Sequence, residues 1–228
     1  MPESLFDKVL SKYGTCDSYM DYGEVIHDSA PKAATFATYY VRPDLFRFEW
    51  KGSPSFHLIL TCKGEKAVVS SGFGLDEPQE FESDKLEAIN KCSRASATAL
   101  AFLYKLLNQD QEGIDYNFLS YLPFKEELSE GNTVLFKSNS ENEINTENLL
   151  VDSKSLTFTE REALFASSES QAKLNAAKYF QDSDPDLAAT LRSEADELKN
   201  TGKLYIMKFL DVEFDSMTDE LKKEKFGV

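Results

Sequence analysis

The sequence predicts an α+β fold built from a meander of antiparallel strands and one strongly apolar helix. Residues 22–71 hold about five short strand-like runs separated by tight turns, without the intervening helices of a βαβ pattern. Residues 84–108 have helical periodicity, and the part from 95 to 107 is apolar on nearly every face. Such a helix needs burial on more than one side, so we expect a core helix or a lid over an apolar cavity.

The aromatic stretch Phe36–Trp50 is the strongest strand signal and the centre of the predicted sheet. Aromatic and β-branched residues alternate with other residues on both sides of Arg42-Pro43-Asp44, from Phe36 to Val41 and from Leu45 to Trp50. A period of two is typical of half-buried strands, and Pro and Asp favour a turn between them. We therefore expect an antiparallel hairpin with one aromatic face.

The remaining elements follow from the same periodicities and from turn residues. The first half of the chain is expected to contain a helix at Ser4–Tyr13, strands at Tyr22–His27, Phe56–Cys62 and Ala67–Ser71, a loop at Gly72–Ser83 and the helix at Asp84–Asn108. The second half is expected to contain strands at Thr133–Lys137, Glu147–Asp152, Ser155–Arg161 and Lys203–Phe214, and a charged helix at Asp219–Lys225. The aromatic stretch Tyr116–Phe124 has no clear assignment, and Ser138–Thr146 is typical of a polar turn.

A helical hairpin is predicted between the last strands, over Glu162–Asn200. Asp184 is a suitable N-cap for its second helix, and Pro185 suits the first helical position. Leucine and alanine residues then recur along one helical face. We expect one domain over residues 1–228, with the segment 162–200 as a helical insertion.

The charge balance argues against some classes of partner. The chain has 25 Lys and Arg residues against 40 Asp and Glu residues, a net charge of −15. Because phosphate binding needs a basic surface, we expect neither nucleic acid nor an anionic membrane as a partner. No apolar run is long enough to span a bilayer. The N-terminus lacks the features of a signal peptide, so we expect a periplasmic or secreted protein if a leader has been removed, and otherwise a cytoplasmic one.

The sequence has no recognisable catalytic or metal-binding motif. Cys16, Cys62 and Cys92 share no CxxC spacing, and their disulfide status is open. His27 and His57 lie on expected strands without the spacing of metal ligands. No nucleophile elbow, HExxH, P-loop or dinucleotide motif is present. We therefore expect a protein that is not an enzyme and that has no cofactor.

Three acids on the last strand form the only other pattern with a chemical interpretation. Asp211, Glu213 and Asp215 alternate with apolar residues, so they lie on one face of a strand. Carboxylates in such an arrangement are suitable ligands for a hard cation. A solvated strand face is the simpler interpretation, and we expect no metal.

The aromatic hairpin and the apolar helix suggest a binding face, and two interpretations stay open. Their side chains either fill a core or line a cavity, since ligand sites are mostly apolar and aromatic with few polar groups. In the second case, the ligand-binding residues are Phe36, Tyr40, Phe46, Phe48, Trp50, Leu100 and Leu103.

The segment Val41–Trp50, Val-Arg-Pro-Asp-Leu-Phe-Arg-Phe-Glu-Trp, resembles the bacterial lipoprotein carrier superfamily with the LolA, LolB and RseB-like fold. Members of that superfamily have a strand ending in Arg-Pro-x-x-Phe-x-Trp/Phe, followed by a strand, a glycine turn and a strand. Phe56–Ser71, with its turn at Lys63–Lys66, is similar to that second hairpin. Weaker similarities lie in Ser18–Val25 and Asn148–Arg161.

The resemblance implies a curved, antiparallel, half-open β-barrel that wraps around a helix, here with an added helical hairpin. It implies a non-enzymatic protein whose concave face binds an apolar ligand, such as a lipid or a lipoprotein acyl chain. It also implies that Arg42 holds a helical lid through hydrogen bonds to the lid backbone. The alternative is an envelope interaction or regulatory module with a filled core and no ligand, and a protein partner bound through residues 162–200.

Overall fold

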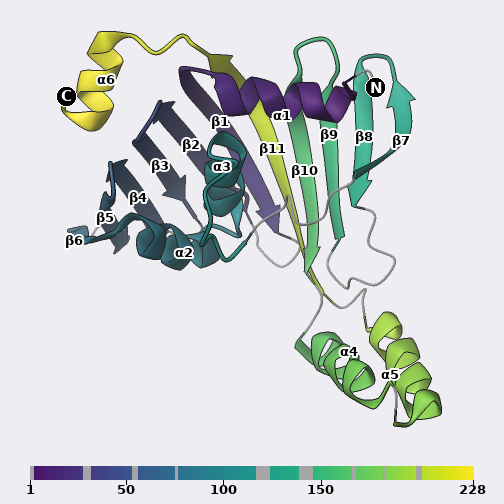
Figure 1. Ribbon diagram of the computed structural model, residues 1–228. Helices are drawn as coiled ribbons and strands as arrows, with labels where there is room; N and C mark the ends of the chain where they lie inside the picture. Colours follow the sequence, from purple (N-terminus) through teal and green to yellow (C-terminus); the bar gives the residue numbers. More distant parts are fainter. Residues whose placement is uncertain are drawn as a thin grey trace.

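The computed structural model describes residues 3–27, 32–52, 56–74, 77–116, 124–138, 146–165, 168–181, 183–198 and 202–228. Its centre is an 11-stranded antiparallel sheet in the order β6-β5-β4-β3-β2-β1-β11-β10-β9-β8-β7. Strands β6 and β7 are the two edges, so the barrel is half-open and the predicted fold class is confirmed. Figure 1 shows α1, α2 and α3 over one face of this sheet.

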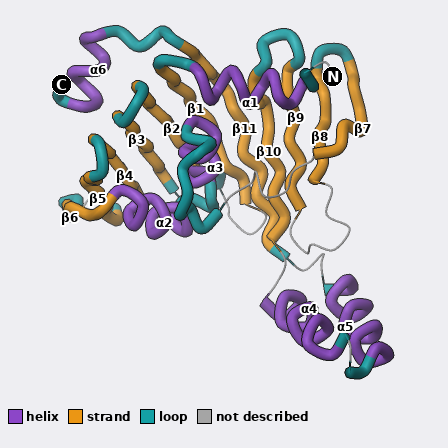
Figure 2. Tube along the Cα trace, in the orientation of Figure 1, coloured by secondary structure: helices purple, strands orange, loops and turns teal. Residues whose placement is uncertain are grey.

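The strands are β1 (Ser18–His27), β2 (Ala34–Val41), β3 (Leu45–Lys51), β4 (Phe56–Lys63), β5 (Lys66–Phe73), β6 (Gln79–Asp84), β7 (Phe124–Glu130), β8 (Thr133–Ser138), β9 (Thr146–Asp152), β10 (Thr157–Phe165) and β11 (Lys203–Phe214). The helices are α1 (Leu5–Thr15), α2 (Lys85–Ala95), α3 (Ala99–Leu107), α4 (Ser168–Phe180), α5 (Pro185–Glu197) and α6 (Asp219–Phe226). Figure 2 shows these helices and strands along the Cα trace.

The predicted aromatic hairpin is present as β2 and β3. Phe36 lies opposite Trp50 and Tyr40 lies opposite Phe46, so the alternating aromatic residues share one face. The same face continues into β1, where Gly23 lies opposite Phe36. A Cβ on Gly23 would lie 2.4 Å from Phe36 Cζ and 2.2 Å from the Lys208 carbonyl oxygen. Glycine at this position therefore lets the Phe36 ring lie across β1.

The predicted helix Asp84–Asn108 is wrong in one respect, because it is two helices that meet at a corner. Ala97 and Thr98 have φ angles of 51° and 64°, in the left-handed region. The Ser96 hydroxyl donates to the Cys92 carbonyl and accepts from Leu100 N at 3.4 Å. Serine side chains compete with the helical backbone in this way, and here the competition ends α2 and starts α3.

Helix α3 fills the concave face of the sheet. Each of its nine residues is buried. The Tyr104 ring packs edge-on against Phe46 with centroids 5.0 Å apart. The Phe102 ring lies 5.9 Å from Phe158 and 6.3 Å from Phe209, on strands of the other half of the sheet. The all-round apolar character of this segment therefore reflects contact with both halves of the half-barrel.

Two strands were missed by the sequence interpretation. Strand β6 begins within the expected loop Gly72–Ser83 and ends one residue after it, and β7 begins at Phe124, the last residue of the unassigned stretch. Both are edge strands rich in Glu, a residue that is depleted in strands but protects sheet edges from further pairing. Their high Glu content therefore made β6 and β7 hard to recognise as strands in the sequence. Residues 117–123 of the unassigned stretch and residues 139–145 of the polar turn lie outside the described residues.

The start of the predicted helical hairpin is also corrected. Strand β10 continues to Phe165, with Glu162 opposite Ile206 and Leu164 opposite Leu204 on β11. The composition Glu-Arg-Glu-Ala-Leu favours a helix, but pairing with strands on both sides overrides that preference. Helices α4 and α5 then lie beyond the lower end of the sheet in Figure 1. Residues 166–167, 182 and 199–201 lie outside the described residues.

The α4 and α5 helices pack against each other through small residues. Ala177, Ala188 and Ala195 are buried between them. The Ser170 hydroxyl donates to the Ala195 carbonyl at 2.8 Å. Asp184 caps α5 as predicted, because its carboxylate accepts from Leu187 N at 3.1 Å.

Helix α6 lies on the opposite face of the sheet from α2 and α3. Lys225 Nζ lies 4.6 Å from the centroid of the Tyr39 ring and 3.7 Å from a Glu49 carboxylate oxygen. Tyr39 and Glu49 alternate with the inward-facing aromatic residues, so they belong to the outer face. Helix α6 therefore covers part of the outer face of β2 and β3.

Candidate functional site

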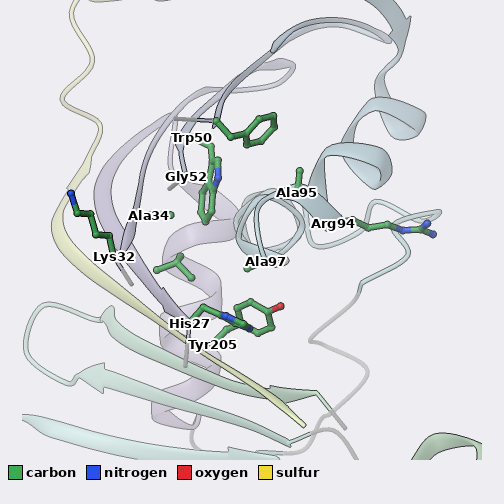
Figure 3. A pocket seen from close by; sticks show the side chains of 11 residues that line it. His27, Lys32, Ala34, Trp50, Gly52, Arg94, Ala95, Ala97 and Tyr205 are labelled. Atoms are coloured by element: carbon green, nitrogen blue, oxygen red, sulfur yellow. The ribbon is translucent and has the colours of Figure 1, made fainter. Parts of the chain in front are cut away.

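A pocket of about 250 Å³ lies between the concave face of the sheet and the corner that joins α2 to α3. Figure 3 shows Trp50 on one side of it, Ala95 and Ala97 on another, and His27 with Tyr205 on a third. The lining residues are Val25, His27, Lys32, Ala34, Trp50, Gly52, Phe56, Arg94, Ala95, Ala97 and Tyr205. They come from β1, β2, β3, β4, β11 and the corner, so several distant segments build this pocket.

The apolar wall of the pocket follows from the β3 and β4 hairpin. Trp50 lies opposite Leu58, and Gly52 N donates to the Phe56 carbonyl at 2.7 Å, which closes the hairpin beside the indole. The side of the pocket formed by the end of α2 and the corner has two small residues, Ala95 and Ala97. Larger side chains there would fill the space.

The corner that forms the pocket roof is held by a buried ion pair. Arg161 Nη2 lies 2.9 Å from Glu147 Oε1, and the two side chains are only 1% and 2% exposed. Arg161 also donates to the Thr98 hydroxyl at 2.9 Å and to the Tyr116 hydroxyl at 2.7 Å. Burial raises the pKa of Glu147, and the Arg161 charge opposes that shift. The ion pair therefore ties β9 and β10 to the strained start of α3.

The seven sequence-predicted ligand residues fall into two groups. Trp50 lines the pocket. The other six are buried in the core at 0–1% exposure, packed with one another or near α3: Phe36, Tyr40, Phe46, Phe48, Leu100 and Leu103. Sequence reasoning did not select the other pocket residues, because the periodicity of one strand gives no information about which distant segment faces its end.

Arg42 links the ends of two helices. Its Nε donates to the Cys16 carbonyl at 2.9 Å, and its Nη2 donates to the Gly14 carbonyl at 2.8 Å. The same Nη2 lies 3.5 Å from the carbonyl of Leu107, the last residue of α3. Carbonyl groups at helix ends lack intrahelical partners, and a guanidinium donates to several of them at once.

Replacing Arg42 with Leu is expected to lower the free energy of unfolding by about 2–3 kcal/mol, because charge-assisted hydrogen bonds to half-buried carbonyls are lost. Hydrogen exchange of the Asn108 amide, which donates to Tyr104 at the end of α3, should become faster. Arg42→Lys is the control: it keeps the charge but not the fork, so it should lose part of the stability. Unchanged stability and exchange in Arg42→Leu would show that this contact does not hold α3.

A second buried carboxyl lies on the concave face, and sequence reasoning missed its importance. Asp21 is 5% exposed, and its Oδ2 accepts from the Tyr19 hydroxyl at 2.7 Å. Burial raises the pKa of Asp21 to about 7, against the opposing effects of Tyr19 and Thr38. The Thr38 hydroxyl lies opposite, but neither it nor Asp21 Oδ1 has a hydrogen bond of acceptable geometry with the described residues. Asp21 alternates with Tyr19 and Gly23 along β1, and this inward-facing position is the sequence feature that could have indicated a buried carboxyl.

The acids of the last strand and the three cysteines do not form a metal-binding cluster among the described residues. Asp215 Oδ1 accepts from Asp17 N at 2.7 Å and Ser18 N at 3.0 Å, so it caps a backbone turn instead of joining Asp211 and Glu213. Within the described residues, no group of three or more His, Cys, Asp or Glu side chains is placed to hold a metal ion. The three cysteines are buried and free. None of the described helices is both long enough and apolar enough to cross a membrane.

Comparison with known proteins gives little. No protein-family model matches the chain, and no curated protein matches it. Among solved structures, the chain is similar to a "putative outer membrane lipoprotein-sorting protein domain" from Vibrio parahaemolyticus, at 8% sequence identity and a TM-score of 0.29, over 95% of this chain and 94% of that chain. A similarity of this size supports no functional assignment.

Proposed function

We propose that this protein is a non-enzymatic binding protein that holds an apolar ligand, such as an acyl chain of a lipid or lipoprotein, in the pocket beside Trp50. The observation that supports this proposal is a pocket of about 250 Å³ on the concave face, with aromatic and small apolar walls. Ligand sites have this composition, with a few polar groups that fix orientation. Each methylene that leaves water contributes about 0.8 kcal/mol.

The size of the pocket limits the ligand. Pockets for drug-sized molecules are about 300–1,000 Å³, and this one is about 250 Å³. One chain segment fits such a space, and several chains side by side do not. We therefore propose one acyl chain as the bound group.

The strained corner also supports a binding role. Ala97 lines the pocket with a φ angle of 51°, and Thr98 follows with 64°. Each such residue costs on the order of 1–3 kcal/mol, and strain of this kind gathers at ligand sites. The corner turns α3 away from α2 and so leaves open the space that a continuous helix would cross.

Ligand binding is expected to appear as co-purified lipid in native mass spectrometry and as saturable binding of a fluorescent fatty-acid probe. Ala95→Leu should weaken probe binding by roughly tenfold, or about 1.4 kcal/mol, because the larger side chain takes up pocket volume that the probe needs. Ala189→Leu, the same exchange at an exposed position of α5, should leave binding unchanged. If no lipid co-purifies and no probe binds to the unmodified protein, the proposal is wrong.

A second candidate function is an envelope interaction or regulatory module with a filled core. Six of the seven predicted ligand residues are covered in the core, and Tyr179 on α4 is 81% exposed. We propose the segment between β10 and β11, residues 166–202 in place of the expected 162–200, as an insertion in a single domain, because the two strands are neighbours in the sheet. Replacement of residues 166–201 by Asn-Gly, which with Gly202 gives a three-residue loop between Phe165 and Lys203, should leave the sheet folded and abolish capture of a protein partner. Capture that survives this replacement would reject the role.

A further inference from the structure

We infer that the ligand of this pocket is a single-chain amphiphile with an anionic head group, a carboxylate or a phosphate, and that Lys32 and Arg94 attract that head group. This inference rests on the proposed function and adds the chemical class of the ligand. It starts from the charges at the pocket. The cations Lys32 and Arg94 line it, and none of its lining residues that the structure describes is Asp or Glu.

This local charge is opposite to that of the whole chain. The chain has a net charge of −15, so an average patch of its surface is acidic. The charged side chains known to line this pocket, Lys32 and Arg94, are both basic, which departs from the average in the direction that favours an anion. A neutral or cationic ligand would gain nothing from this arrangement.

The two flanking cations also lack strong counter-charges. Lys32 is exposed and makes no ion pair or hydrogen bond with any residue that the structure describes. Arg94 Nη2 lies 3.8 Å from Asp115 Oδ2, with the two side chains 85% and 64% exposed. An exposed pair at that distance contributes little. By contrast, Lys85 and Lys173 form close ion pairs with Glu65 and Glu194 at 2.9 Å and 2.6 Å.

The positions of the groups suit an amphiphile. Figure 3 shows Lys32 on the strand side of the pocket and Arg94 on the helix side, with the Trp50 indole between them. In Figure 3 the charged ends of Lys32 and Arg94 both point away from the Trp50 indole, toward opposite sides of the view, so each lies at its own part of the pocket rim. A chain that lies against Trp50 and Phe56 would carry its head group out at this rim. Long basic side chains reach such a group while their stems stay on apolar surface.

Competition of four twelve-carbon compounds with the fluorescent probe tests the inference: dodecanoate, dodecyl phosphate, dodecanol and dodecyltrimethylammonium, each below its aggregation limit. The two anions are expected to bind at least about fivefold more tightly than dodecanol, and the cation least tightly. Lys32→Gln and Arg94→Gln should each weaken binding of the anions about two- to fivefold and leave dodecanol unchanged. Lys154→Gln changes the net charge equally at an exposed site in the β9–β10 turn and serves as the control.

The outcomes separate this inference from the proposed function. If dodecanol binds as tightly as dodecanoate, or if Lys154→Gln weakens anion binding as much as Lys32→Gln does, the head-group inference is overturned and the apolar site stands. If none of the four compounds competes and the probe itself does not bind, the proposed function fails as well. Tighter binding of both anions than of dodecanol supports the inference, and a preference between dodecanoate and dodecyl phosphate shows whether the head group is a carboxylate or a phosphate.

Discussion

Replacing Arg161 with Met is expected to lower the free energy of unfolding by about 3–5 kcal/mol, because the change leaves the Glu147 carboxylate buried without its counter-charge. The two side chains are 1% and 2% exposed, so water does not replace the lost partner. The same change removes the donors to the hydroxyl groups of Thr98 and Tyr116. Urea unfolding followed by circular dichroism measures the loss.

The double variant Arg161→Met/Glu147→Leu is the control for this interpretation. Because it removes both charges and fills the volume with apolar side chains, it should recover much of the lost stability. The guanidinium of Arg161 also lies 4.9 Å from the Phe102 ring centroid, a contact that Met partly replaces. Equal stability of the single and double variants would mean that the uncompensated charge is not the cause of the loss.

The corner that lines the pocket should respond to the same change. Thr98 loses its hydrogen bond to β10 in Arg161→Met, so the hydrogen bonds that remain at the α2–α3 corner among the described residues are local ones, such as Thr98 N to Ser93 O at 2.9 Å. Probe binding should therefore weaken in Arg161→Met. If the shape of the pocket depends on packing more than on the Arg161–Thr98 hydrogen bond, binding should recover in part in the double variant.

Replacing Asp21 with Asn is expected to remove a pH dependence of stability that the unmodified protein shows between about pH 4 and pH 7. Burial raises the pKa of Asp21 from 3.8 to about 7, so the folded protein holds a proton that the unfolded chain has released. The folded state therefore binds more protons in this window, and the free energy of unfolding falls as pH rises. Three pKa units set an upper bound of about 4 kcal/mol on the fall.

Below about pH 4 the carboxyl is neutral in both states, and above about pH 7 it is charged in both, so the contribution of Asp21 is constant there. Asn keeps an acceptor for the Tyr19 hydroxyl and never ionises. Asp21→Asn should thus gain stability over the unmodified protein as pH rises from 4 to 8. Asp110→Asn, at an exposed site, is the control, and parallel curves for the unmodified protein and Asp21→Asn would contradict the buried, proton-holding state.

The aromatic hairpin shows what local periodicity predicts well. Alternation from Phe36 to Trp50 indicates both strands, the turn and the buried face, because a period of two is a property of neighbouring residues. The opening helix and the last strand follow from equally local signals. The break in the helix at Ala97 was not predicted, because serine hydrogen bonds compete with a helix only through geometry that the residue types do not determine.

The pocket and the Arg161–Glu147 ion pair could not be predicted from the sequence for a different reason. Glu147 and Arg161 meet through the pairing of β9 with β10, and Trp50 meets Tyr205 and Ala97 through the curvature of the whole sheet. Such contacts depend on register and sheet order, which a single sequence does not contain. Only Trp50 was selected in advance, because its own strand places it on the aromatic face.

Trp50 also provides the most direct test of the binding claim. It is the only tryptophan of the chain, it lines the pocket, and it is 5% exposed, so its fluorescence reports on this site alone. Titration with a fatty acid brominated along its chain should quench this fluorescence in a saturable manner, because bromine quenches an indole that it contacts. The unbrominated acid should not quench, and Ala95→Leu should shift the quenching to higher concentration. Fluorescence that stays unchanged at all concentrations of the brominated acid below its aggregation limit would contradict an acyl chain beside Trp50.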